Sequence, residues 1–128
     1  MIKYLKYLLM VSAVIAVVAS AYAQQYAPIN PTYQSNVVAA IYKAEGGANT
    51  RYPYGIKSVD CGGDVSKARK ICFNTVRNNY IRWQAAGKTN DFIQFLGARY
   101  CPIGAKDDPR NLNSNWVRNV KKILAQGT

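Results

Sequence analysis

Glu45 is the residue of this sequence best suited to acid–base chemistry. It is the only glutamate in the chain, and the chain has no histidine that could act as a base. Val37 and Ile41 precede Glu45 at intervals of four residues, which predicts that it completes the apolar face of a helix. Gly46 and Gly47 follow directly and predict that the helix ends there.

The acidity of Glu45 follows from this expected position. A carboxyl group in the last turn of a helix faces the negative end of the helix macrodipole, and packed neighbours remove part of its hydration. Both effects disfavour the charged form, so we expect the pKa of Glu45 to be raised. An acid still protonated near neutral pH can give a proton to the departing oxygen of a glycosidic bond. The alternative is a solvated surface glutamate at a helix end.

Other catalytic chemistries are disfavoured by what the chain lacks. Without histidine, neither a Ser-His-Asp nor a Cys-His arrangement can form. The spacing of Cys61, Cys72 and Cys101 matches no zinc pattern, so we expect no metal and no cofactor. In an oxidising compartment these cysteines allow one disulfide and leave one thiol, and the sequence does not fix the pairing.

The first 23 residues have the order of a signal peptide. Lys3 and Lys6 precede an apolar run over residues 8–18, and small residues close the segment at Ala23. The run is shorter than the roughly 20 residues of a membrane-spanning helix, although an uncleaved anchor is the alternative. We therefore expect export to the periplasm or the medium, with residues 24–128 forming one domain.

The charge balance indicates an anionic partner. The chain has a formal net charge of +11, of which the expected signal peptide contributes two charges. Such a field attracts anionic polymers and surfaces. For an exported protein, the cell wall or a membrane surface is a more fitting partner than nucleic acid. A basic surface that only aids solubility is the alternative.

The remaining pattern predicts a mainly α domain with one short β-hairpin after the first helix. Residues 52–59 mix aromatic and β-branched residues with Pro and Gly, as in a short strand or hairpin. A long helix is expected to run to about residue 86, and Trp83 and Trp116 lie on apolar stripes, which indicates core positions. The expected N-caps of the four helices are, in order, Ser35, Asp64, Thr89 or Asn90, and Ser114.

Several motifs together resemble the active-site segment of the lysozyme-like superfamily, which includes lytic transglycosylases and phage-type lysozymes. They are Glu45-Gly46-Gly47, then Tyr52-Pro53-Tyr54-Gly55-Ile56, then Ser58, and the segments 96–102 and 113–117 also look like small exported members. The resemblance covers roughly residues 36–124 and implies an α+β lysozyme-like catalytic domain. Glu45 would then be its catalytic acid, with a β element forming the cleft wall. The Ala-Tyr-Asn and Gly-Leu-Met-Gln motifs of larger members are missing, so no substrate-orienting residues are carried over from them.

The candidate substrate-binding residues follow from these motifs. Gly55 would let a glycan approach the backbone, with Ile56 completing the Gly-aliphatic step. Tyr52 and Tyr54 offer flat faces for sugar rings, or else they pack inside the domain. Ser58 suits a hydrogen bond to an acetamido group, or else a turn. By resemblance, Tyr100 stands at the position of the cleft tyrosine.

The reaction is expected to be either lysis or hydrolysis of the MurNAc-GlcNAc bond of peptidoglycan. A hydrolase needs a second carboxylate, for which Asp60 is the candidate, since Asp64 serves as a helix cap. By resemblance, a lytic transglycosylase needs only Glu45, acting as general acid and then as base, which favours the lyase. A non-catalytic glycan-binding protein is the third possibility. The expected partners of this monomer are peptidoglycan glycan strands, with envelope or secretion-apparatus proteins as further candidates.

Overall fold

The structure, a computed structural model, describes residues 25–57 and 64–127, and these residues form helices without any strand. The α-helices are α2 (Pro31–Ala44), α3 (Val65–Ala85), α4 (Phe92–Tyr100) and α5 (Trp116–Ala125), and the short 3-10 turns are η1 (Gly47–Asn49), η2 (Pro53–Gly55) and η3 (Leu112–Asn115). The mainly α class is thus confirmed. The expected signal peptide, residues 1–23, lies outside the described residues. Within the described ranges, no helix is long and apolar enough to cross a membrane.

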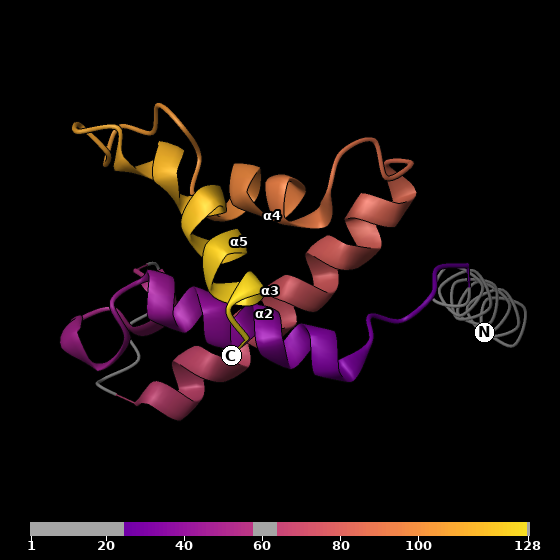
Figure 1. Cartoon of the computed structure of the whole chain (residues 1–128), viewed down its shortest axis with the longest axis horizontal. Helices are drawn as coiled ribbons and strands as arrows, with labels where there is room; N and C mark the ends of the chain where they lie inside the picture. Colours follow the sequence, from indigo (N-terminus) through magenta and orange to yellow (C-terminus); the bar gives the residue numbers. More distant parts are fainter. Residues whose placement is uncertain (1–24, 58–63, 128) are drawn as a thin grey trace, which may run out of the picture.

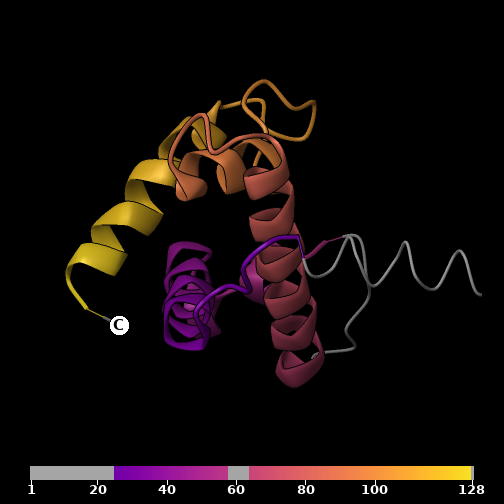
Figure 2. The ribbon, with the colours of Figure 1, turned by 90° about the vertical axis from the view of Figure 1, so that its right-hand side faces the viewer.

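Helix α2 is enclosed by its neighbours. It packs against α3 on one side and α5 on the other, while α4 packs against both of these helices. Figure 2 shows the resulting arch, with α4 at the top joining α3 to the yellow α5. The centre of the core is made by residues with no exposed surface from each helix: Val37, Ala40 and Ile41 of α2, Cys72 and Val76 of α3, Leu96 of α4 and Val120 of α5.

Helix α2 begins earlier than the sequence pattern predicted. The N-cap is Asn30, whose side-chain oxygen accepts a hydrogen bond from the backbone N–H of Tyr33 at 3.0 Å. Pro31 then occupies the first helical position, where its fixed φ angle suits the helix and its missing N–H costs nothing. Ser35, the expected cap, therefore lies inside the helix.

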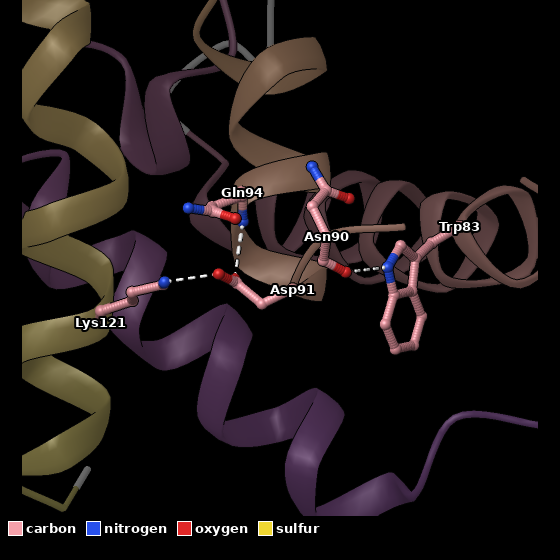
Figure 3. Close-up of polar contacts among 5 residues, drawn as sticks. All are labelled: Trp83, Asn90, Asp91, Gln94 and Lys121. Atoms are coloured by element: carbon pink, nitrogen blue, oxygen red, sulfur yellow. Dashed lines mark hydrogen bonds and ion pairs between the residues drawn. The ribbon is translucent and has the colours of Figure 1, made fainter. Parts of the chain in front are cut away.

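The N-caps of the later helices agree with the prediction once in three cases. Asp64 caps α3 as expected, accepting hydrogen bonds from the backbone N–H groups of Ser66 and Lys67. Helix α4 is capped by Asp91 rather than by Thr89 or Asn90. The carboxylate of Asp91 accepts from Gln94 N at 3.0 Å and also binds Lys121 of α5 at 2.6 Å (Figure 3).

The start of α5 also differs from the prediction. Ser114 lies in η3, where its hydroxyl donates a hydrogen bond to the carbonyl oxygen of Asn111 at 2.7 Å. The first residue of α5 is Trp116, and Asn115 occupies the cap position without a side-chain hydrogen bond to the helix. The hydroxyl of Ser114 is therefore engaged within η3 and does not cap α5.

The predicted β-hairpin is not supported. Its described part forms the turn η2, in which Gly55 N donates to the carbonyl of Tyr52 at 2.9 Å. Pro53 has no N–H to offer to a strand ladder, and Tyr54 and Gly55 both have positive φ angles, which fold the chain back. The rest of the expected hairpin falls on residues outside the described ranges.

Candidate active site

Glu45 follows the last residue of α2 and is half-buried. Its backbone N–H closes the helix on the carbonyl of Ile41 at 2.9 Å. Its side chain meets the start of α5, where the indole Nε1 of Trp116 donates a hydrogen bond to Oε1 at 2.8 Å. The acid predicted from the sequence is therefore held at the junction of two helices.

The pKa of Glu45 is raised above its usual value, as the sequence predicted. Burial is the main cause, because it penalises the charged carboxylate. The hydrogen bond from Trp116 and the positive charge of Lys57 favour the ionised form, but they only partly offset burial. Glu45 is thus better able to hold its proton than an exposed glutamate.

Gly55 lies directly against this carboxyl group. A Cβ atom at position 55 would come within 2.7 Å of both Cδ and Oε2 of Glu45, closer than such atoms approach. Gly55 also has a φ of +68°, a conformation that other residues adopt only at a cost. The structure brings Glu45 and Gly55 together, and only glycine fits this position.

Two pockets meet at Glu45, one of about 370 Å³ and one of about 280 Å³. Both are lined by Glu45, Cys101 and Asn113, so the two pockets adjoin. Together they form one cleft that runs along the carboxyl group of Glu45. The larger pocket adds residues of η3 and α5, namely Leu112, Asn115, Trp116 and Asn119. The smaller one adds Gly55, Lys57, Tyr100, Pro102 and Asp107. In Figure 1, the end of α2, the η2 turn and the 101–115 segment lie on the same side of the molecule.

The predicted aromatic residues take different places. Tyr52 is 40% exposed and offers a free ring, whereas Tyr54 is only 5% exposed and packs against Tyr42 with ring centroids 4.9 Å apart. Packing, the alternative left open for Tyr54, is what the structure shows. Tyr100 lines the smaller pocket, and its hydroxyl donates to the carbonyl oxygen of Tyr54. Ile56 is half-buried against the core.

The cysteines of the described region are not bonded to each other. Cys72 and Cys101 are free thiols, and burial raises the pKa of Cys72 to about 12 and that of Cys101 to about 11. Neutral thiols are weak nucleophiles, so neither residue is suited to covalent catalysis. Cys61 lies outside the described residues, as do Ser58 and Asp60, and a disulfide through Cys61 stays a prediction.

Sequence reasoning missed most of the residues that line the cleft, among them Lys57, Asp107, Asn113 and Trp116. Trp116 was placed in the core, and it is indeed only 5% exposed, but its indole N–H faces the acid. A buried indole needs a hydrogen-bond acceptor, which was the available signal. Asp107 is a carboxylate that lines the same pocket as Glu45. Within the described ranges, no group of three or more potential metal ligands occurs.

The chain matches no protein-family model, no curated protein and no solved structure. The likeness to lysozyme-like enzymes therefore rests on the motifs quoted above, and the geometry around Glu45 is the independent support for a function.

Proposed function

We propose that this chain is an exported lytic transglycosylase of peptidoglycan, with Glu45 as its only acid–base group. The observation that carries the proposal is a half-buried carboxyl group with a raised pKa at the point where two pockets meet. General acid catalysis at a glycosidic bond needs both properties, because the acid must keep its proton and must reach the bond.

The reaction then runs in two proton transfers. Protonated Glu45 donates its proton to the glycosidic oxygen as the bond from that oxygen to C1 of the muramic acid breaks. The Glu45 carboxylate next takes the proton of the 6-hydroxyl of the same sugar, whose oxygen bonds to C1 and closes a 1,6-anhydro ring. Glu45 ends protonated, so no second carboxylate and no water are consumed.

Hydrolysis is the second candidate, because Asp107 lines a pocket with Glu45. A second carboxylate in the cleft could act as a nucleophile or could activate water, as in retaining and inverting glycosidases respectively. Asp60, the acid expected from the sequence, lies outside the described residues. Asp64 is engaged as the cap of α3 and lines neither pocket.

Mass spectrometry of the fragments released from purified peptidoglycan tests both candidates. Anhydro ends support the lyase, whereas reducing ends that disappear in Asp107→Asn support the hydrolase. Glu45→Gln keeps the size of the side chain but removes the acid, so we expect it to abolish release while binding to peptidoglycan persists. Full release by Glu45→Gln would refute the assignment, and binding without release by the wild-type chain would favour a glycan-binding protein.

A further inference from the structure

Trp116 holds the carboxyl group of Glu45 from a position that is itself fixed on two sides. Its ring stacks on that of Tyr100, with centroids 5.3 Å apart and planes inclined by 25°. Gly97 of α4 lies close by, since a Cβ atom there would come within 3.1 Å of Cε3 of the indole. The indole has little freedom to turn, so its N–H stays directed at Oε1 of Glu45.

This geometry distinguishes the two oxygens of Glu45. An indole N–H can only donate, so Oε1 must accept. In a protonated carboxyl group the carbonyl oxygen is the better acceptor, and the proton then lies on the other oxygen. That other oxygen, Oε2, is the nearer of the two to Gly55, since a Cβ atom there would come within 2.7 Å of Oε2 and 3.0 Å of Oε1. Glu45 and Gly55 both line the smaller pocket.

We propose that Trp116 is a positioning residue, whose indole N–H holds Oε1 of Glu45 and so directs the acidic proton to Oε2, beside Gly55. The role assigned to the proton rests on the proposed function, but its location does not. Gly55 has no side chain, so Oε2 can lie directly against its backbone, where any Cβ atom would displace it.

The other groups around Glu45 leave this role to Trp116. The titratable residues nearby are Lys57, Cys72, Tyr100, Cys101 and Asp107. Tyr100 donates to the carbonyl of Tyr54, and Cys101 donates to Asn113 Oδ1 at 2.8 Å. Within the described part of the chain, the indole N–H makes the one hydrogen bond to the Glu45 side chain.

The substitution Trp116→Phe tests the proposal on the full chain, because it keeps a flat ring between Tyr100 and Gly97 but removes the donor. Carboxyl NMR should show that the pKa of Glu45 rises, since a hydrogen bond that favours the charged form is lost. The matched control is Trp83→Phe, which removes an indole N–H that donates to the carbonyl of Asn90 at 2.7 Å, outside the cleft. That control should leave the pKa of Glu45 unchanged.

A second measurement needs no variant that might fail to fold. In the wild-type chain, the Trp116 indole N–H resonance should shift with pH at the pKa of Glu45, and in Glu45→Gln it should stay constant. An unchanged pKa in folded Trp116→Phe, or an indole resonance insensitive to the ionisation of Glu45, would overturn the proposal.

Turnover separates this proposal from the proposed function. With peptidoglycan, Trp116→Phe should lower kcat by about tenfold or more with little change in KM, because misplacing a catalytic group costs rate rather than binding. The alkaline limb of its pH profile should move to higher pH with the pKa. Lower kcat with no change in either limb would count against the positioning role. If the NMR shifts appear but the wild-type chain cleaves no peptidoglycan, the positioning stands and the proposed function fails.

Discussion

Gly55 presents only a hydrogen atom to the carboxyl group of Glu45, and this contact can be tested alone. In Gly55→Ala the new Cβ would lie 2.7 Å from Oε2, so the acid must move. The positive φ adds a cost of about 1–2 kcal/mol for any residue with a Cβ. We expect at least a hundredfold loss of turnover together with a lower Tm.

Gly87→Ala is the matched control for this substitution. Gly87 also has a positive φ, of +84°, but a Cβ atom there would meet nothing within 4 Å. It should therefore lose only the stability that the positive φ costs, about 1–2 kcal/mol, and keep its activity. Equal turnover in the two variants would mean that the contact with Gly55 does not position the acid.

The raised pKa of Glu45 makes the stability of the domain depend on pH in a definite direction. Burial keeps the proton on the folded chain after the unfolded chain has lost it. As the pH rises from the unfolded pKa through the folded one, the free energy of unfolding falls, because the folded state must then hold a buried charge. Glu45→Gln carries no such charge. The Tm of this variant minus the Tm of the wild type should therefore increase from pH 4 to pH 8. A difference in Tm that is constant across this range would contradict the assignment.

At the residue scale, the sequence predicted the neighbours of Glu45 that are close to it along the chain. It did not predict the residue that contacts Glu45 from a distant part of the sequence. The helix period placed Glu45 at the end of α2, and Gly55, ten residues on, was expected at the same cleft. Trp116 is 71 residues away, and no local pattern links an indole N–H to a carboxylate across that separation. The apolar ring of Trp116 dominated the pattern, whereas its single polar atom makes the hydrogen bond to Glu45.

At the element scale, the close approach of α4 and α5 sets the position of Trp116. A Cβ atom on Gly97 would lie 2.5 Å from Cγ2 of Val117, the residue after Trp116. Gly97→Ala should therefore push α5 away and cost about 1–3 kcal/mol of unfolding free energy, although alanine is the better helix former. Urea unfolding measures this loss, and turnover should fall with it.

Ala98→Gly provides the comparison at the next position of the same helix, where the side chain is exposed. It should cost about 1 kcal/mol through helix propensity alone and leave turnover intact. A stabilised Gly97→Ala chain would show that the two helices can separate without loss, and the proposed fixing of Trp116 would fail with it.

Turn chemistry explains where the predicted elements were wrong. The sequence pattern started α2 too late, at Ser35, although Pro31 suits the first turn of a helix. Aromatic and β-branched residues around η2 indicated strands, but Pro53 and the positive φ of Gly55 select a turn instead. The long helix α3 was predicted well because its cap Asp64 and its apolar period agree. In the short segments no such agreement between a cap residue and an apolar period is available.

At the scale of the whole molecule, helix α3 presents a surface of positive charge only. Helix α3 carries no acidic residue but five cations, Lys67, Arg69, Lys70, Arg77 and Arg82, all of them exposed. Three of the five described acids, Glu45, Asp107 and Asp108, lie in the cleft or in the loop beside it. Within the described ranges, the one ion pair joins Lys121 to Asp91. Among the described residues, the α3 cations therefore form no ion pair, so their charges can meet an anionic polymer.

This distribution predicts that retention on the cell wall and turnover can be separated. Replacing Lys70 and Arg77 together by glutamine should weaken binding to intact peptidoglycan several-fold at low salt and reduce its salt dependence. Cleavage of short soluble glycan fragments should be unchanged, because neither residue lines the cleft. Replacing Lys43 and Lys122, two exposed cations on other helices, removes the same net charge. If this second pair weakens binding equally, net charge controls retention rather than the α3 surface. A larger loss from the α3 pair would show that the α3 surface carries the contact with the wall.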